Sequence, residues 1–265
     1  MLPPQSPDFP DNLVFLHGMF GKPWHWQACA DHVASSWRVL NPVLPLLDTQ
    51  ADSKAIIALG DHVAREMDAA GMDQAVLAGN SLGGHIAARM ALGRPDRVAG
   101  LVLTGSSGLF ERGLSSIPRR PTESWIRIKM REVFHDPVHV TEELVAEMCA
   151  FLSNIRRVLQ MIRIARCAKR DSLRDLLSEI TCPVLLIWGE NDDVTPPAVG
   201  HEFHERLPRS QLHMLERCGH VPMVEHPGVF NELVASFLAG VRFGQGRPAV
   251  EVHPARGVSP LSACA

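Results

Sequence analysis

A serine in a glycine-flanked turn is the residue with the clearest potential for chemistry. Residues 79–83 read Gly-Asn-Ser-Leu-Gly and match the pattern G-x-S-x-G, with Ser81 at the centre. The apolar run at 74–78 predicts a strand before the turn, and the spacing over 82–92 predicts a helix after it. On such a turn the hydroxyl projects outward, while the small glycines let strand and helix pack closely. Ser81 is therefore the predicted nucleophile.

A serine hydroxyl is a weak nucleophile at neutral pH, so it needs a base and an acid that orients the base. Of the 13 histidines, His220 follows the last predicted strand, in the segment Cys-Gly-His-Val-Pro. Loops at this edge of an open parallel sheet gather reacting groups. The acid is expected after the fifth strand, where Asp192 and Asp193 lie side by side. Neighbouring side chains in a turn diverge, so Asp192 is the predicted acid and Asp193 the alternative.

Acyl transfer also needs two N–H groups that stabilise the developing oxyanion. The first is expected from the backbone of Leu82, directly after the nucleophile. The second is expected from the loop after the first strand, which reads His-Gly-Met-Phe-Gly. Its glycines let the loop fold back toward Ser81, and Met19 and Phe20 are both candidates for the donor. His17 is expected to brace this loop rather than to transfer protons.

The elements that must hold these residues follow a pattern of apolar runs alternating with helical stretches. This pattern predicts an α/β fold, a doubly wound and mainly parallel sheet with helices on both faces. Six strands are predicted, at residues 12–16, 37–43, 74–78, 98–104, 183–188 and 210–215. Helices are predicted at residues 52–70, 82–92 and 229–239.

The alternation stops between the fourth and fifth strands, where only helical patterns occur. An excursion of this length is more typical of an inserted helical cap than of a loop. The predicted organisation is a core of residues 1–106 and 179–241, a cap at 107–178 and a flexible tail at 242–265.

Composition excludes several classes of function. The chain has 265 residues, 46% of them hydrophobic and 21% charged, with a net charge of −3. These values are ordinary for a soluble globular protein and favour neither a nucleic-acid partner nor a membrane surface. No apolar stretch reaches the roughly 18 residues of a membrane span, and a signal peptide is not expected. Six scattered cysteines without metal-site spacing predict reduced thiols, no bound metal and a cytoplasmic location.

These motifs, in this order, resemble the α/β-hydrolase superfamily over about residues 12–240. The resemblance implies a triad of Ser81, Asp192 and His220, a substrate pocket between core and cap, and no cofactor. A serine nucleophile separates the chain from the haloalkane dehalogenases and epoxide hydrolases of that superfamily, which use an aspartate.

Two groups of the superfamily are most similar, the small carboxylesterases and the meta-cleavage-product hydrolases. The second group cuts a carbon–carbon bond in vinylogous 1,5-diketones. Asn80 favours that group, whereas Val221 stands where a tryptophan usually follows its catalytic histidine. The leading expectation is hydrolysis of carboxylic esters of small or medium acyl substrates. Carbon–carbon hydrolysis of dienol acids is the alternative. A binding protein that has lost catalysis is a third reading, which the intact triad order argues against.

Substrate contacts are less specific in the sequence. The candidates are one polar residue beside the nucleophile and three aromatic residues: Asn80, Trp24, Phe110 and Trp125. A basic helix predicted over 153–168 carries arginines beside its apolar stripe, at positions 156, 157, 163 and 166. One of them could hold a substrate carboxylate by a charge-assisted pair. A solvated helix face is the favoured alternative.

Overall fold

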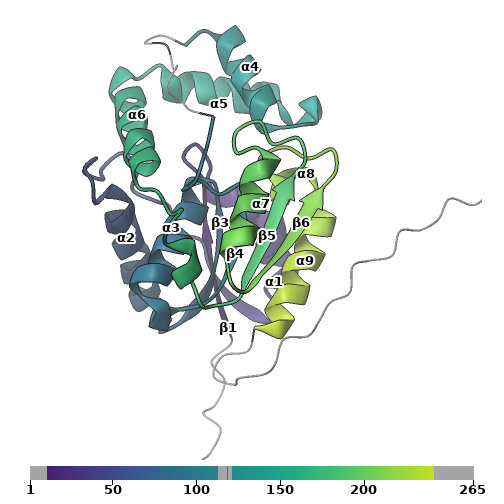
Figure 1. Cartoon of the computed structure of the whole chain (residues 1–265). Helices are drawn as coiled ribbons and strands as arrows, with labels where there is room; N and C mark the ends of the chain where they lie inside the picture. The colour runs from purple at the N-terminus through teal and green to yellow at the C-terminus, as the bar shows by residue number, and fades with distance from the viewer. Residues whose placement is uncertain (1–10, 113–117, 119–120, 242–265) are drawn as a thin grey trace, which may run out of the picture.

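Six parallel strands form one sheet in the order β2-β1-β3-β4-β5-β6 (Figure 1). The computed structural model describes residues 11–112, 118 and 121–241. The strands are β1 (Asp11–Leu16), β2 (Trp37–Leu40), β3 (Ala75–Asn80), β4 (Val98–Thr104), β5 (Val184–Gly189) and β6 (Ser210–Leu215). Every predicted strand is present. β2 ends earlier than predicted, before Pro42, since proline has no N–H to donate to the ladder.

Helices cover both faces of the sheet. One face carries α1 (Gln27–Val33) and α9 (Pro227–Gly240). The other carries α2 (Ala55–Ala69), α3 (Leu82–Gly93) and α7 (Pro197–Arg206). Short helices complete this part of the chain: η1 (Pro23–Trp26), η2 (Pro95–Arg97), η5 (Leu177–Glu179) and α8 (Pro222–Glu225).

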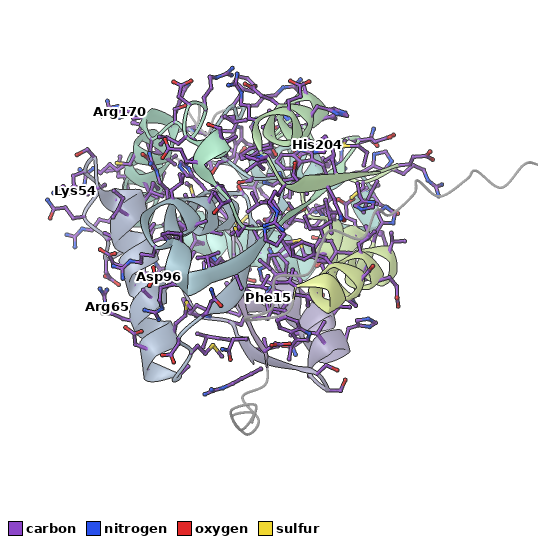
Figure 2. All side chains as sticks on the ribbon, turned by 60° about the horizontal axis from the view of Figure 1, so that its bottom comes forward. Phe15, Lys54, Arg65, Asp96, Arg170 and His204 are labelled. Carbon is purple, nitrogen blue, oxygen red and sulfur yellow. The ribbon has the colours of Figure 1, made fainter. Side chains whose placement is uncertain are left out.

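The strands divide their side chains between two apolar cores. Along β1, Leu13 and Phe15 join the core under α1 and α9, whereas Val14 and Leu16 join the core under α2 and α3. This alternation is the period of two expected for a strand. Phe15 lies inside the molecule, in contrast to labelled charged side chains at its edge such as Lys54 (Figure 2). β3 and β5 are buried at every position, which explains their continuous apolar sequence.

Among the described residues, three α-helices lie between β4 and β5 in the chain, above the carboxyl ends of the strands (Figure 1). They are α4 (Glu123–Val133), α5 (Glu142–Leu152) and α6 (Ile155–Arg170), with the turn η4 (Pro137–His139) after α4. We call α4, η4, α5 and α6 the insertion. Each α-helix begins at a side-chain cap, namely Thr122, Thr141 or Asn154.

The insertion has an apolar cluster of its own, formed by Ile126, Met130, Val145, Leu152 and Val158. The described residues between β4 and β5 contain no strand, as the helical pattern there predicted. A boundary between core and cap at residues 107 and 178 stays a prediction. The predicted tail at 242–265 lies outside the described residues. Across the described ranges, none of the helices combines the length and apolarity needed to cross a bilayer.

Candidate active site

Ser81 lies on a sharp turn between β3 and α3. Its backbone has φ 55° and ψ −118°, a conformation that non-glycine residues rarely adopt. The turn is tight enough that a Cβ on Gly79 would lie 2.4 Å from Gly83, and one on Gly83 would lie 2.1 Å from the Leu16 carbonyl oxygen. The backbone conformation of Ser81 costs about 1–3 kcal/mol, and strain of this kind is typical of functional sites. The glycines of the motif are therefore required by close backbone approach.

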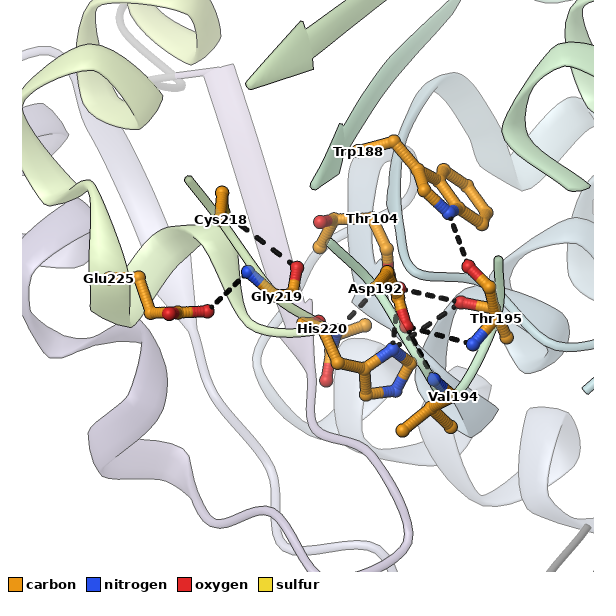
Figure 3. Close-up of polar contacts among 10 residues, drawn as sticks. Thr104, Trp188, Asp192, Val194, Thr195, Cys218, Gly219, His220 and Glu225 are labelled. Atoms are coloured by element: carbon orange, nitrogen blue, oxygen red, sulfur yellow. Dashed lines mark hydrogen bonds and ion pairs between the residues drawn. The ribbon is translucent and has the colours of Figure 1, made fainter. Parts of the chain in front are cut away.

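His220 and Asp192 form a buried pair (Figure 3). The His220 Nδ1 lies 2.8 Å from the Asp192 Oδ2. The other carboxylate oxygen accepts the backbone N–H groups of Val194 and Thr195, each at 2.8 Å, and the Thr195 hydroxyl donates to Oδ2 at 2.8 Å. These donors hold an ionised carboxylate in place. Asp192 then fixes the proton on Nδ1, which leaves Nε2 as the nitrogen able to accept one.

The neighbouring Asp193 points elsewhere. Its carboxylate accepts a hydrogen bond from Arg112 at 2.7 Å, and its side chain is 58% exposed. Because β5 ends in a turn, the two adjacent aspartates diverge, one toward His220 and one toward solvent. The structure brings together the acid and base preferred from the sequence, Asp192 and His220.

Ser81 and His220 line the same cavity, which has a volume of about 210 Å³. Asp192 lies behind His220 and takes no part in the lining. The upper wall comes from α4 and α5 and is mostly apolar, with Trp125, Ile126, Met130, Leu144 and Met148 among its residues. The cavity therefore lies between Ser81 and the insertion.

The loop after β1 lies beside the nucleophile. A Cβ added to Gly18 would be 3.2 Å from the Ser81 Cβ, so the loop backbone reaches the reacting side chain. His17 braces this loop as expected, since its Nδ1 lies 2.8 Å from the Gly18 carbonyl oxygen and its Nε2 accepts the Leu44 N–H at 3.0 Å. Burial lowers the pKa of His17, which keeps the ring neutral and suited to this bracing.

The three predicted oxyanion donors all line the cavity: Leu82, Met19 and Phe20. Leu82 opens α3, and N–H groups of a first helical turn have no partner inside the helix. Its N–H is therefore suited to an anion at the turn. The choice between Met19 and Phe20 as the second donor stays a prediction.

Two of the four predicted substrate contacts, Trp125 and Asn80, line the cavity, and the other two do not. Trp125 lines the cavity, but Trp24 and Phe110 are not among its lining residues and are 46% and 54% exposed. The Trp24 ring instead stands edge-on to His25, with ring centroids 4.2 Å apart, and His25 takes the position at the cavity. Asn80 lines the cavity, yet its side-chain amide donates to backbone carbonyls of the protein.

The arginines of α6 do not reach the cavity. None of the four singled out in the sequence, at positions 156, 157, 163 and 166, is a lining residue. α6 buries Val158, Met161, Ile164 and Ala168, so its arginines lie on other faces of the helix. The solvated-face reading fits these positions, and the carboxylate-binding role does not.

Sequence reasoning did not single out five charged or titratable residues that line the cavity: His25, Glu111, Arg112, Lys129 and Glu132. Burial lowers the pKa of His25 to about 4 and raises that of Glu111. Lys129 and Glu132 pair with each other at 2.7 Å across one helical turn. That i,i+3 spacing is visible in the sequence, but surface pairs share it.

Metal ligation has no support in the described ranges, where no group of three or more His, Cys, Asp or Glu side chains could hold an ion. The five cysteines of those ranges are free thiols.

The fold agrees with comparison to known families. Residues 13–233 match the model of the alpha/beta hydrolase family. This chain belongs to that family.

Several curated relatives share one more specific name. The 2-hydroxy-6-oxononadienedioate/2-hydroxy-6-oxononatrienedioate hydrolase of Klebsiella pneumoniae is 30% identical, with 88% of each chain covered. A hydrolase of the same name from Burkholderia vietnamiensis is 35% identical over 65% of each chain. For the Dechloromonas aromatica relative of this name, the match spans 64% of that protein's length, just under two thirds.

Solved structures give the same fold. MGS-MChE2, an alpha/beta hydrolase enzyme from the metagenome of sediments of the Mar Chica lagoon, is 30% identical with a TM-score of 0.69, covering 88% of this chain and 92% of that one. The meta-cleavage product hydrolase CumD from Pseudomonas fluorescens IP01 has a TM-score of 0.76 at 22% identity, covering 88% and 92%. At that identity the likeness concerns the fold alone.

Proposed function

We propose that this chain is a serine-dependent hydrolase that cleaves a carbon–carbon bond next to a ketone, in dienol acids of the meta-cleavage type. The observation that carries the proposal is the buried His220–Asp192 pair, at 2.8 Å, behind a cavity that Ser81 and His220 line together. A strained serine, an oriented imidazole and a shared cavity are the requirements of nucleophilic catalysis at a carbonyl.

In the first half of the proposed reaction, His220 accepts a proton and then donates it. The Ser81 hydroxyl adds to the ketone carbon while its proton passes to the His220 Nε2. The Leu82 N–H, with that of Met19 or Phe20, stabilises the oxyanion. The bond is broken in the keto tautomer, a vinylogous 1,5-diketone in which the enol proton has moved to the carbon next to the ketone. Collapse of the oxyanion then breaks the bond to that carbon, and the leaving carbanion, delocalised as a dienolate through the second carbonyl, takes the proton from His220. Water, deprotonated by His220, then releases the acyl group as a carboxylic acid.

The choice of bond rests on two supports. Several curated relatives, at 30 to 35% identity, carry names of carbon–carbon hydrolases of this type. The sequence adds Asn80 directly before the nucleophile, which also favours that group.

Ester hydrolysis by the same triad is the second candidate, favoured by the charges of the cavity. The lining cations of the described residues are Arg112 and Lys129, and each already has a carboxylate partner, Asp193 and Glu132 respectively. The rest of the wall is largely apolar, which suits the neutral acyl chain of an ester better than an acid.

A fluorophosphonate probe tests the nucleophile before any substrate is known. Labelling of the wild-type protein and none of Ser81→Ala is the expected result. A chain that takes no label would refute the serine mechanism. Turnover of a 2-hydroxy-6-oxo-dienoate, followed by loss of its absorbance, is then compared with release of p-nitrophenol from acyl esters. Ester turnover without dienoate cleavage would replace the leading proposal by the second candidate.

The substrate class follows from the same reasoning. We infer a small organic molecule that fits a cavity of about 210 Å³.

The free thiols of the described residues support the predicted cytoplasmic location.

A further inference from the structure

We propose that Glu225 is a positioning residue that ties the loop of His220 to the end of α4, so that the base and the cavity wall move together. This inference rests on the proposed role of His220 as the base. Glu225 belongs to α8, five residues after His220, and does not line the cavity.

The Glu225 carboxylate bridges two segments that are far apart in the chain. Its Oε1 accepts the N–H of Gly219 at 2.7 Å, directly before the base (Figure 3). Its Oε2 accepts the N–H groups of His135 and Asp136, at 2.7 and 3.2 Å, in the turn after α4. One anion therefore satisfies three backbone donors, and charge-assisted bonds of this kind are about twice as strong as neutral ones.

A second contact joins the same two segments. The N–H of His220 itself donates to the carbonyl oxygen of Val133, the last residue of α4, at 2.7 Å. The residue before it must be small, because a Cβ on Gly219 would lie 2.5 Å from that oxygen and 2.9 Å from the Glu225 Oε1. The backbone of the base is thus pressed against the end of α4 with no room for a side chain.

The segment that Glu225 holds is also a wall of the cavity. α4 contributes Trp125, Ile126, Lys129, Met130 and Val133 to the lining. A displacement of α4 by a substrate is therefore transmitted to Gly219 and His220 through the Glu225 carboxylate. Small displacements of a catalytic group have large effects, since a misplacement of about 1 Å costs on the order of 100-fold in rate.

The bridge that Glu225 makes between Gly219 and the turn after α4 requires a carboxylate. All three partners are N–H donors, so both oxygens must accept. In Glu225→Gln one oxygen becomes an NH₂ group that opposes a backbone N–H, and one side of the bridge opens. Gly219→Ala also separates the two segments, because its methyl group pushes against the Val133 carbonyl oxygen, and it leaves the Glu225 carboxylate intact. Glu216→Gln is the matched control, because Glu216 is exposed on the same connection between β6 and α8.

The experiment compares these variants with the wild-type protein well below their unfolding temperatures. Glu225→Gln and Gly219→Ala are expected to lower kcat and the rate of fluorophosphonate labelling by about 10- to 100-fold, with KM little changed. Glu216→Gln is expected to match the wild type. If Glu225→Gln does not fold, Glu225→Asp, which keeps the charge but is one methylene too short to reach both segments, takes its place.

A readout that needs no turnover separates this inference from the proposed function. In ¹H–¹⁵N spectra of the histidine side chains, Glu225→Gln and Gly219→Ala are expected to shift the His220 ring signals, and Glu216→Gln is not. If the fluorophosphonate does not react with the wild-type protein, the serine mechanism is refuted. The spectra would still test whether Glu225 positions His220. A folded Glu225→Gln variant with wild-type kcat and unshifted His220 signals would overturn the inference.

Discussion

The side chain of Asn80 holds the backbone of His220. Its Nδ2 donates to the His220 carbonyl oxygen at 3.0 Å and to the Thr104 carbonyl oxygen at 3.1 Å. Asn80 is the residue before the nucleophile, and its side chain is almost fully buried. The turn that presents Ser81 is therefore fastened directly to the loop that presents the base. In this position the residue sets the geometry between nucleophile and base.

Replacing Asn80 tests this reading against a substrate-binding role. Asn80→Ala leaves the buried His220 carbonyl without its donor, at a cost of about 1–3 kcal/mol in folding stability, whereas the Thr104 carbonyl still accepts the Ser81 N–H. If Asn80 positions His220, kcat falls by about 10- to 100-fold while KM changes little. A raised KM at unchanged kcat would instead assign Asn80 to substrate binding. Asn80→Asp, which cannot donate, is expected to lose at least as much activity.

The two adjacent aspartates provide the sharpest pair of variants. Asp192→Asn places an amide against the His220 Nδ1 and favours the wrong tautomer, so kcat is expected to fall by about 10⁴-fold. Asp193→Asn removes only an exposed ion pair with Arg112, worth less than about 1 kcal/mol, and is expected to keep near wild-type activity. Steady-state kinetics on both variants give the answer, and equal losses would contradict the assignment of Asp192.

The strands and the order of the site residues were readable in the sequence because they depend on local patterns. A buried parallel strand is a continuous apolar run, as in β5, and its carboxyl end is where reacting groups collect. Ser81 and Asp192 each follow such a run, and His220 follows the partly exposed strand β6, so their meeting could be predicted without knowing the packing. The glycines of the Ser81 turn carried the same kind of local signal.

Contacts that depend on packing between distant segments were not readable. Trp24 and His25 are neighbours in η1, and only the rotation of that short helix decides that His25 rather than Trp24 reaches the cavity. Glu225 meets His135 across 90 residues of chain, and nothing in either local sequence marks the partner. The arginines of α6 were ambiguous for the same reason, since the face of α6 that packs inward sets their direction.

The partly buried position of His25 gives the folding stability a defined pH dependence. Burial lowers the pKa of this ring to about 4, and His17 and Lys22 act in the same direction. An unfolded chain takes up the proton near pH 6.5, whereas the folded chain resists it down to about pH 4. The contribution of His25 is thus complete above pH 6.5 and is lost as the pH falls toward 4, by at most about 1.4 kcal/mol per pH unit.

Urea unfolding between pH 7 and pH 4 measures this dependence. In His25→Gln the free energy of unfolding is expected to fall less steeply over that range than in the wild-type protein. His32→Gln serves as the control, because His32 is exposed and its partner Glu232 lies 3.8 Å away at the surface. Identical slopes in the wild-type protein and His25→Gln would show that another group titrates in this window.

An ionic contact joins α6 of the insertion to α3, the helix that begins directly after Ser81. Asp171, at the end of α6, accepts a bidentate pair of hydrogen bonds from Arg89 of α3, and the His85 Nε2 lies 3.1 Å from its Oδ2. Burial acts to raise the pKa of Asp171, but Arg89 and His85 outweigh it and bring the value to about 2. A lowered carboxyl pKa stabilises the folded state above pH 3.8, and this contribution is lost as the pH falls toward 2.

Asp171→Asn should therefore destabilise the protein at pH 7, by about 1–3 kcal/mol because a partly buried Arg89 loses its anion. The difference from the wild type should shrink as the pH falls from 4 toward 2, where the wild-type carboxylate is itself protonated. Asp175→Asn, at an exposed site near the end of α6, is expected to leave stability unchanged at every pH. Urea unfolding of the three proteins at pH 7 and pH 3 distinguishes the cases. A deficit in Asp171→Asn that is as large at pH 3 as at pH 7 would mean that the charge of Asp171 is not what joins α6 to α3.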